Sequence, residues 1–406
     1  MLLRSFALRL VFTFVVRLIS TLAGVCALSG LVCVAAPTDV LVHDAASLRA
    51  AVAAAQPGTR ILLARGSYGG GFHFTRLRGA PGQPIIIAAA DPKNPPVFSN
   101  AKTGLHLSNP AHVELHDLVF EKLSDNGLNI DDGGRFADDA TGAHHLVLRR
   151  LHSRDIGTTG NQDGIKLSGL HDFRVEDCTV EHWGTGGGSA IDMVGCHRGV
   201  IIGCTIRHRE PAPPNCTGVQ CKGGTSEVAI LRNRFEHAGG RGVNLGGSTG
   251  RPFFRPPLAT TPGAMHAEAR ALRVEGNTFI GGVTAVAFVG VDGASVRFNT
   301  IVRPGRWALR ILQETRAADF VPSRDGVFSD NVIIFDSTAW STGGVNIGAG
   351  TAPATFTFAR NWWWCRDQPK LSGPTLPTAE VDGVHGRDPS TAEGQVGADA
   401  WSGNRQ

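Results

Sequence analysis

Short runs of alternating apolar and polar residues recur along this chain. In each run a small residue is followed by an apolar, a mostly polar and another apolar residue, as in Gly-Leu-Asn-Ile at residues 127–130. Further copies lie at residues 164–167, 190–193, 218–221, 242–245, 285–288, 308–311 and 344–347. Alternation of this kind is typical of β-strands, whose apolar side chains point to one face and whose polar side chains point to the other.

A second recurring element places a polar or small residue two positions before a large apolar one. Its copies begin at Cys178, Cys204, Asn233, Asn277, Asn299, Asn331 and Asn361. Their spacing falls in the range of about 20–50 residues that is typical of repeat proteins. One repeat cannot bury its own apolar face, so the copies must stack. The pattern predicts an all-β fold, a right-handed parallel β-helix, which is a solenoid.

Asparagine begins five successive copies of this second element, from Asn233 to Asn361. Each amide can form a hydrogen bond with the same group one coil along, so we expect a buried ladder. Cys178 and Cys204 hold the same column earlier in the chain. We expect them to be buried as well, and a disulfide between adjacent coils is the alternative. No Cys/His spacing typical of a zinc finger is present, so structural zinc is not expected.

The two ends of the repeat region predict caps. Residues 45–55 have the pattern of a short amphipathic helix, and a strand follows at residues 60–64. Because an open stack of strands exposes sheet edges, we expect an N-terminal capping helix within a cap over about residues 40–65. The Pro- and Gly-rich tail at residues 366–406 is expected to wrap the other end. Residues 37–406 are interpreted as a single domain.

Residues 1–36 have the pattern of a signal peptide. Arg4 and Arg9 provide a basic start, and residues 18–34 are apolar and uncharged. Small residues then follow, as a cleavage site requires. We therefore expect the protein to be secreted or periplasmic. The alternative is a retained leader that anchors the protein to a membrane.

Charge excludes one class of partner. The formal net charge is +4, and Arg4, Arg9 and Arg17 in the leader account for three of these charges. Proteins that bind nucleic acid usually carry a basic block or stripe, and none is visible here. We therefore expect no nucleic acid as partner, and we expect a monomer. Attraction to an acidic ligand must come from local clusters.

One face of the stacked strands carries the candidate chemistry. Adjacent coils lie about 4.8 Å apart, so outward side chains form a row that can contact consecutive sugars of a bound chain. The row contains Asn129, Lys166, Asp192, Gln220, Asn244, Ala287, Arg310 and Asn346, and Lys222 lies beside Gln220 on the same face. We predict substrate-binding roles for Lys166, Asp192, Gln220, Asn244 and Arg310. A Pro-rich insertion at residues 248–268 is expected to form a wall beside the row.

The capping segment, the sequence PGQPIIIAAADPKNPPVFS at residues 81–99 and the coils together resemble the pectate-lyase-like β-helix superfamily, above all its chondroitinase B and alginate lyase family. The resemblance covers most of the chain after the leader. It implies an acidic, uronic-acid-containing polysaccharide as partner and β-elimination as reaction. It further implies a lysine as base, an arginine as acid and, in many members, Ca²⁺ at the substrate carboxylate.

Only part of the family's site carries over to this sequence. The segment VQCKG matches the position of the family lysine, which implies that Lys222 is the base. The column of the family arginine holds Gly246 here, and Arg241, which begins the same segment, is the candidate that replaces it. The acidic residues that bind calcium are not reproduced, because Asn215 and Thr217 stand near that position. The identity of a metal cofactor therefore stays open.

Three functions remain open at this stage. The first is a polysaccharide lyase, in which Lys166 or Arg241 crowds the base, because a lysine is a poor base unless neighbouring cations disfavour its charged form. The second is a glycoside hydrolase that uses carboxylates such as Asp163 and Asp192. The third is a carbohydrate-binding protein without catalysis.

Histidines also recur at one turn position of successive coils. His182, His208 and His237 each lie four residues after the start of the second element. We expect them to form a stacked ladder in the turns. Metal binding by these three histidines is the alternative.

Overall fold

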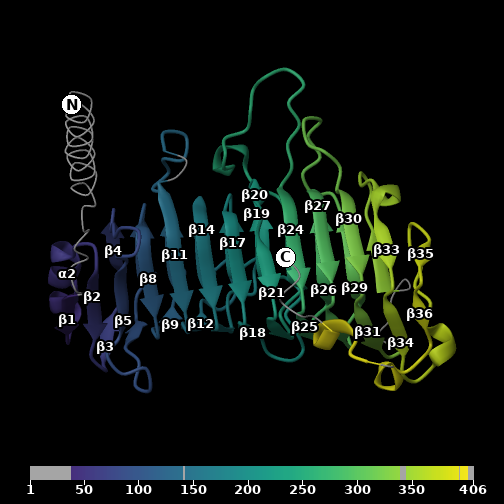
Figure 1. Cartoon of the computed structure of the whole chain (residues 1–406), viewed down its shortest axis with the longest axis horizontal. Coiled ribbons are helices and arrows are strands. Elements are labelled where there is room, and N and C mark those ends of the chain that lie inside the picture. Colours follow the sequence, from purple (N-terminus) through teal and green to yellow (C-terminus); the bar gives the residue numbers. More distant parts are fainter. Residues whose placement is uncertain (1–37, 140–141, 339–343, 393, 401–406) are drawn as a thin grey trace, which may run out of the picture. The chain divides into compact units, whose positions relative to one another are not determined.

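The computed structural model describes residues 38–139, 142–338, 344–392 and 394–400, and the predicted signal peptide lies outside these residues. From Thr38 onward the chain forms one compact unit. This unit is built from three long β-sheets, which Figure 1 shows stacked strand by strand. Each coil adds a strand to each sheet in turn, so the predicted parallel β-helix is confirmed.

Sheet A contains the strands β1 (Thr38–Val42), β2 (Thr59–Leu63), β5 (Ile85–Ala89), β8 (Ala111–His116), β11 (Ala143–Arg149), β14 (Leu170–Glu176), β17 (His197–Ile202), β20 (Thr225–Ser226), β21 (Ala229–Leu231), β24 (Ala269–Glu275), β27 (Val291–Arg297), β30 (Arg324–Ser329), β33 (Thr357–Ala359) and β35 (Glu380–Val381). Sheet B contains β3 (Ser67–Gly69), β6 (Val97–Ser99), β9 (Val119–Leu123), β12 (His152–Ile156), β15 (Thr179–Glu181), β18 (Thr205–Arg207), β22 (Arg234–Glu236), β25 (Thr278–Ile280), β28 (Thr300–Val302), β31 (Val332–Phe335), β34 (Trp362–Cys365) and β36 (Val384–His385).

Sheet C positions the candidate site. It contains β4 (Phe72–Thr75), β7 (Leu105–Ser108), β10 (Leu128–Asp131), β13 (Ile165–Ser168), β16 (Ser189–Val194), β19 (Thr217–Lys222), β23 (Arg241–Gly246), β26 (Thr284–Val289), β29 (Trp307–Leu312) and β32 (Val345–Ile347). Neighbouring strands pair in parallel, as in β13 with β16 and β16 with β19. The inward side chains, such as Ile165 and Leu167, are fully buried. The apolar side chains of the alternating pattern therefore point inward, as predicted.

The N-terminal cap is the helix α2 (Ala45–Ala54), close to the predicted residues 45–55. Asp44 accepts a hydrogen bond from the backbone N–H of Ser47 at 2.7 Å, and the Ser47 hydroxyl oxygen accepts one from the N–H of Asp44 at 3.1 Å. This reciprocal pair satisfies donors at the start of the helix that have no partner inside it. The helix buries Leu48, Ala51 and Val52 over the first coil.

Short 3-10 helices lie in the loops and the tail. They are η1 (Arg251–Phe253), η3 (Pro353–Thr355), η4 (Pro369–Leu371), η5 (Pro389–Thr391) and η6 (Gly397–Ala400). In the tail, β35 and β36 each add a last strand to a sheet. The chain then returns to sheet B, where the N–H of Ala398 donates to the hydroxyl of Thr300 at 3.0 Å. The tail thus covers part of the last coils.

The predicted asparagine ladder is confirmed. The side-chain amide of Asn277 donates to the carbonyl oxygen of Asn299 at 3.0 Å, and the Asn299 amide donates to Asn331 at 2.9 Å. The ladder begins at Asn233 and ends at Asn361. Every member is buried, so each amide satisfies polar groups that have no access to water.

The cysteines match the expectation of burial. Cys178 and Cys204 lie at the start of the asparagine column, and both are buried with free thiols. The backbone N–H of Cys204 donates to the side chain of Asn233 at 2.9 Å, which continues the ladder by one coil. The alternative of a disulfide between these two coils is wrong, because the described cysteines are all free.

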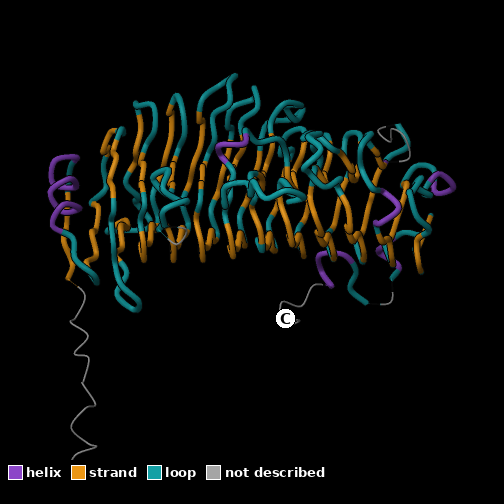
Figure 2. Tube along the Cα trace, turned by 90° about the horizontal axis from the view of Figure 1, so that it is seen from above, coloured by secondary structure: helices purple, strands orange, loops and turns teal. Residues whose placement is uncertain are grey.

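Three long loops leave the helix along one edge, where strands of sheet C lead into strands of sheet A (Figure 1). They connect β10 to β11, β23 to β24 and β29 to β30. In Figure 2, which is seen from above, these loops lie over the coils on the side that faces the viewer. The middle loop contains the predicted insertion at residues 248–268. Loops on a rigid scaffold commonly carry function, so this edge directs attention to sheet C.

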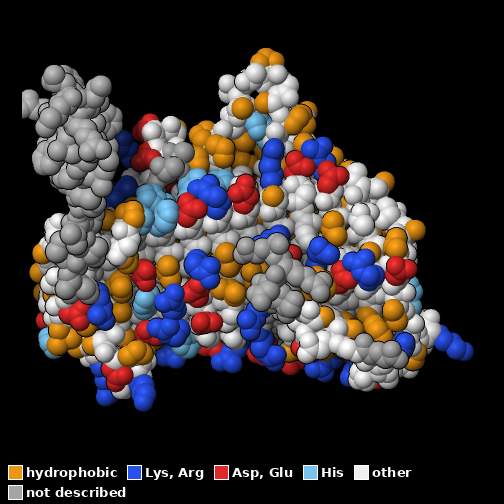
Figure 3. Space-filling model, viewed as in Figure 1, with side chains coloured by type: hydrophobic (Ala, Val, Ile, Leu, Met, Phe, Trp, Pro, Cys, Tyr) orange, Lys and Arg blue, Asp and Glu red, His pale blue; other side chains and the backbone are white. Residues whose placement is uncertain are grey.

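The face in Figure 3 carries basic and acidic side chains side by side. Many of them form ion pairs between adjacent coils of sheet A, such as Arg198 with Asp172 and Arg324 with Asp292. Since each such cation is neutralised by a neighbour, this face offers little net charge to a polyanion. Within the described part of the chain, no helix is long and apolar enough to cross a membrane.

Candidate functional site

The predicted row lies in register on sheet C. Lys166 pairs with Asn129 on one side and with Asp192 on the other, and Gln220 pairs with Asp192 and with Asn244. The register continues through Ala287, Arg310 and Asn346. The prediction that these side chains share one face is therefore confirmed.

The row is not evenly exposed to solvent. Asp192 and Asn244 are 2% and 1% exposed, and Ala287 is fully buried. Lys166, Gln220 and Arg310 are partly exposed. The expectation of an open row of substrate-binding groups therefore needs correction, because Asp192 and Asn244 are covered by their neighbours. Their polar atoms hold other side chains in place, and the charged groups of this face form two clusters.

The first cluster consists of Asp163, Lys166, Asp192 and Lys222, and we call it the lysine–carboxylate cluster. The ammonium of Lys166 donates to Asp163 Oδ2 and to Asp192 Oδ2, both at 2.8 Å. The ammonium of Lys222 lies 3.3 Å from Asp192 Oδ1. Asp192 therefore lies between two lysines, and Lys166 lies between two carboxylates.

Asp163 occupies the turn just before β13 and is fixed by the backbone. Its Oδ1 accepts a hydrogen bond from the N–H of Ser189 at 2.8 Å, and its own N–H donates to Asn126 at 3.0 Å. Burial, together with the charge of Asp192, raises the pKa of Asp163 to about 6. The carboxyl group that the hydrolase hypothesis used is therefore a buried partner of Lys166.

Neighbouring charges decide the ionisation of Lys166 and Asp192. For Lys166, burial alone would lower the pKa, but the charges of Asp192 and Asp163 outweigh it and raise the pKa. For Asp192, burial acts to raise the pKa, and the charges of Lys166 and Lys222 outweigh it and lower the pKa. Lys166 thus keeps its proton. Lys222 binds the same carboxylate, and its side chain is 22% exposed, against 30% for Lys166. The carboxylate of Asp192 lies between the two lysines that were expected to crowd each other.

The second cluster lines a hollow of about 500 Å³, and we call it the arginine pocket. Its charged and aromatic members are Arg241, Arg306, Trp307, Arg310 and Glu314. The guanidinium groups of Arg306 and Arg310 each lie 4.3 Å from the centre of the Trp307 ring. Because both contacts use the ring, Trp307 orients the two arginines by cation–π attraction.

Arg241 and Arg310, predicted from separate repeats, meet in this pocket. Arg241 donates to Glu314 at 2.7 Å and to Asn244 at 3.1 Å. Burial and the nearby charge of Arg241 lower the pKa of Arg310. Three arginines face one acidic side chain here, so the pocket keeps a net positive charge that suits a carboxylate or sulfate group.

The sequence suggested that Arg241 lies beside Lys222, and the structure contradicts this. It pairs in register with Thr217, at the other end of β19 from Lys222. Five residues of strand separate their backbones by roughly 16 Å along the strand. The side chain of Arg241 extends back toward Lys222 as far as Asn244. The two clusters are therefore linked along the strand through Gln220 and Asn244 rather than by direct contact.

The column that holds the arginine of the resembled family has no room for a side chain here. Gly246 has φ +104°, and a Cβ atom placed on it would lie 1.8 Å from the carbonyl oxygen of Val289. A side chain is excluded both by this contact and by the left-handed backbone. Arg241 is therefore the arginine of this segment that can contribute to a site.

The insertion forms the predicted wall. Arg255 binds the buried Asp132 through two nitrogens, at 2.5 and 3.0 Å. Its side chain crosses Gly169 and Gly195, where a Cβ atom would lie within 3 Å of Arg255. At the other end, the buried Glu268 accepts hydrogen bonds from Gly223 and Thr249. The insertion is thus fixed along the edge of sheet C where Lys222 ends its strand.

Sequence reasoning missed several members of these clusters. Arg306 lies in the turn before β29, Trp307 begins that strand, and Glu314 follows it in a loop, so the repeated strand pattern did not select them. The sequence analysis considered Asp163 as a catalytic residue of a hydrolase, but it did not predict the ion pair between Asp163 and Lys166. The signal that could have found it is the spacing from Asp163 to Lys166, which places both at the same end of one strand.

The turn histidines are only partly stacked. The rings of His182 and His208 lie 5.6 Å apart and edge to face. His208 bonds the backbone carbonyl of Trp183 at 3.0 Å, and His237 faces Glu210 at 3.6 Å. The expected ladder therefore has two members in contact.

Comparisons with known proteins place this arrangement in a family. A family model described as "Right handed beta helix region" matches residues 99–309. A solved rhamnogalacturonan lyase is similar with a TM-score of 0.53 and 14% identity, over 78% of this chain and 82% of that one. An alginate lyase from Paenibacillus sp. has a TM-score of 0.50 and 17% identity, over 77% of this chain and 99% of that one.

A lacto-N-biosidase from Eubacterium ramulus is similar in the same way, with a TM-score of 0.50 and 13% identity over 81% of this chain and 62% of that one. No curated protein sequence matches the chain. At such low identities these likenesses show a shared fold, and that fold carries different reactions on carbohydrates. The family model spans just over half of the sequence, so this chain belongs to the right-handed β-helix family.

Proposed function

We propose that the protein is a polysaccharide lyase, which cleaves a uronic-acid-containing polysaccharide by β-elimination with Lys222 as the proton acceptor. The observation that carries the proposal is the cationic surface of sheet C, where Lys222 and the arginine pocket flank Gln220 and Asn244. Two of the similar structures are lyases, one named for alginate and one for rhamnogalacturonan. Both kinds of polymer contain uronic acids.

The reaction requires three groups around one sugar. The base removes the proton on C5, the electron pair of that C–H bond forms the C4–C5 double bond, and the bond from C4 to the glycosidic oxygen breaks. The leaving oxygen takes up a proton. A cation at the substrate carboxylate stabilises the negative charge that develops during the transfer.

The structure supports a separate role for each cluster. Lys222 is the less constrained lysine of its cluster, since it makes one ion pair and Lys166 makes two. Asp192 positions Lys222 through their ion pair, and Lys166 in turn holds Asp192. Arg310 and Arg306 are proposed to bind the substrate carboxylate, and Arg241 is proposed to donate to the leaving oxygen. Gln220 and Asn244 connect these groups along the strand.

A hydrolase is the less favoured function. Hydrolysis needs two carboxyl groups that flank the scissile bond. Asp163 and Asp192 are both 2% exposed, and the ammonium of Lys166 occupies the space between them. A sugar cannot reach that space. The carboxylates also already bind lysines, so Ca²⁺ has no free oxygen ligands in this cluster, and we propose no calcium cofactor.

We also propose that the protein acts outside the cytoplasm, in the periplasm or beyond the cell. The apolar stretch at residues 18–34 and the small residues after it support export. A polymeric substrate supports the same location, because a polysaccharide chain is first cleaved outside the cytoplasm.

The test is a screen of the purified protein against alginate, pectate, chondroitin and other acidic polymers. A lyase creates an unsaturated uronide, which absorbs in the ultraviolet, and a hydrolase releases reducing ends without that absorbance. We expect the absorbance to grow with one polymer. The rate of this growth should be roughly 10²–10⁴-fold lower for Lys222→Ala, because a general base usually contributes that much to the rate. Full activity of Lys222→Ala would exclude the proposed base.

A further inference from the structure

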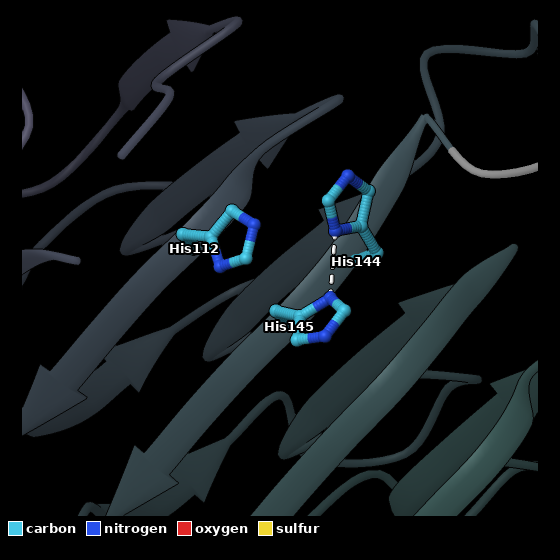
Figure 4. Close-up of side chains that lie close together, drawn as sticks. All are labelled: His112, His144 and His145. Atoms are coloured by element: carbon cyan, nitrogen blue, oxygen red, sulfur yellow. Dashed lines mark hydrogen bonds between the residues drawn. The ribbon is translucent and has the colours of Figure 1, made fainter. Parts of the chain in front are cut away.

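Three histidines of sheet A gather outside the proposed polysaccharide site. They are His112 of β8 and His144 and His145 of β11, two strands that pair directly. The face in Figure 3 shows histidine side chains together over these strands. Figure 4 shows the three rings turned toward one another, with a hydrogen bond between the Nδ1 atoms of His144 and His145 at 2.8 Å.

The backbone brings these rings together. His112 and His145 have φ values of 49° and 56°, in the left-handed region that few residues other than glycine adopt. They occupy the same kink in successive coils, since Leu146 pairs with Val113 just after it. His144, one residue before the kink, approaches from the side. Ring centres are 4.6 Å apart for His112 and His145, and 5.0–5.1 Å apart for the other two pairs.

We infer that His112, His144 and His145 form a site for a divalent transition metal ion, with Zn²⁺ as the ion of choice. One nitrogen of each ring lies within 4.8 Å of the others. Tetrahedral Zn²⁺ with Zn–N bonds of about 2.0–2.1 Å needs ligand nitrogens roughly 3.3 Å apart. Small rotations of these partly exposed rings bring them to that separation.

The chemistry of the donor set selects the class of metal. Imidazole nitrogen suits Zn²⁺, Cu²⁺ and Ni²⁺, whereas Ca²⁺ and Mg²⁺ take oxygen ligands. Three protein ligands leave a fourth position for water or for an atom of another bound molecule. The ion would also tie one coil to the next, because His112 belongs to one coil and the other two histidines to its neighbour.

The charged groups nearest to the three rings are held by other partners. Arg78 itself donates to Asn109, and Asp172 on the other side is paired with Arg198. Neither charge is free to occupy the space between the rings.

The test is Zn²⁺ binding by the full chain without an affinity tag, measured by calorimetry and by thermal unfolding with and without the ion. We expect one Zn²⁺ per chain, a higher melting temperature, and a tetrahedral absorption spectrum when Co²⁺ replaces it. In His112→Asn and in His145→Asn the affinity should fall by at least roughly tenfold, the smallest loss that changes at metal sites commonly cause. Asparagine suits these two positions because it tolerates the left-handed backbone.

His237→Asn is the matched control. His237 has φ 48° and lies outside the cluster, so this variant should bind Zn²⁺ like the unchanged chain. Circular dichroism of each variant checks that the coils are intact. Unchanged affinity in His112→Asn and His145→Asn would overturn the inference, as would a loss of binding in His106→Gln, because His106 and its stacked neighbour His73 lie on sheet C.

Discussion

The ammonium of Lys222 lies 3.3 Å from Oδ1 of the buried Asp192. An opposite charge this close holds the ammonium of Lys222 in place. This relationship makes Asp192 a positioning residue for the proposed base.

Asp192→Asn should lower kcat more than it changes KM. The amide keeps the shape of the carboxylate but removes the charge that holds the ammonium of Lys222 in place. The measurement is kcat and KM, determined separately on the polymer found in the screen. An unchanged kcat in a variant whose circular dichroism shows intact coils would contradict this role.

Lys166→Met should destabilise the protein more than Lys222→Met. Without Lys166, Asp163 loses the lysine with which it is paired and Asp192 keeps Lys222, so buried carboxylates are left poorly paired. Breaking a buried ion pair by removing one partner costs about 3–5 kcal/mol. Lys222→Met leaves Asp192 paired with Lys166 and should cost about 1 kcal/mol or less. Urea unfolding of the two variants measures the difference, and equal losses would refute the assigned geometry.

Asp163 should make stability depend on pH between about 4 and 6. Its pKa is raised from 3.8 to about 6 in the folded chain. Below 3.8 both the folded and the unfolded chain are protonated there, and the contribution of Asp163 to stability is complete. As the pH rises through about 6, the folded chain must hold a buried charge and that contribution is lost. The effect is the reverse of that of an ordinary ion-paired aspartate.

The matched variant for this prediction is Asp163→Asn, which does not titrate. Thermal unfolding from pH 4 to pH 7 should show that the unchanged chain loses stability relative to this variant as the pH rises. The comparison is needed because buried histidines act in the opposite direction. Burial and His171 lower the pKa of His197 to about 4, so His197 favours the folded chain at higher pH. Parallel curves would exclude the proposed titration of Asp163.

The fold could be predicted because its physical causes are local and repeated. Each coil carries the same alternation, and one coil alone cannot bury its apolar face. Asn277 and Asn299 lie in one column because a parallel stack places equivalent residues of successive coils side by side, where their buried amides pair. The register of Lys166 with Asp192 follows from the same repetition. These features depend on periodicity, which a sequence displays directly.

The rest of the site depends on turns and loops, which do not repeat. Glu314 reaches Arg241 from a loop 73 residues later, and Arg255 reaches Asp132 across 123 residues. His112 and His145 meet because both backbones turn left-handed, and histidine gives no sequence signal for that conformation. Alternation also predicted which way Asp192 points, but not that neighbouring side chains would bury it.

Asn299→Ala should cost roughly 3 kcal/mol of stability. The Asn299 side chain donates to Val274 and to Asn331 and accepts from Asn277, all in the buried interior. Each buried polar group left without a partner costs about 1–3 kcal/mol. The exposed Asn94, which bonds only Asp91 locally, is the control, and Asn94→Ala should change the urea midpoint little. Similar losses in both variants would show that the ladder contributes no stability.

Arg255→Ala should release the insertion from the edge of sheet C. Asp132 is buried and bonded to Arg255 through two nitrogens, so the variant leaves a carboxylate without its cation inside the protein. A loss of this kind costs about 3–5 kcal/mol, and the chain can avoid part of it by moving the insertion away. Limited proteolysis should therefore cut residues 248–268 faster in this variant. Arg251→Ala is the control, since its pair with Asp319 is exposed and exposed pairs contribute about 0–1 kcal/mol. If both variants are cut at the rate of the unchanged chain, the insertion is held by its packing on Gly169 and Gly195 and not by the buried ion pair.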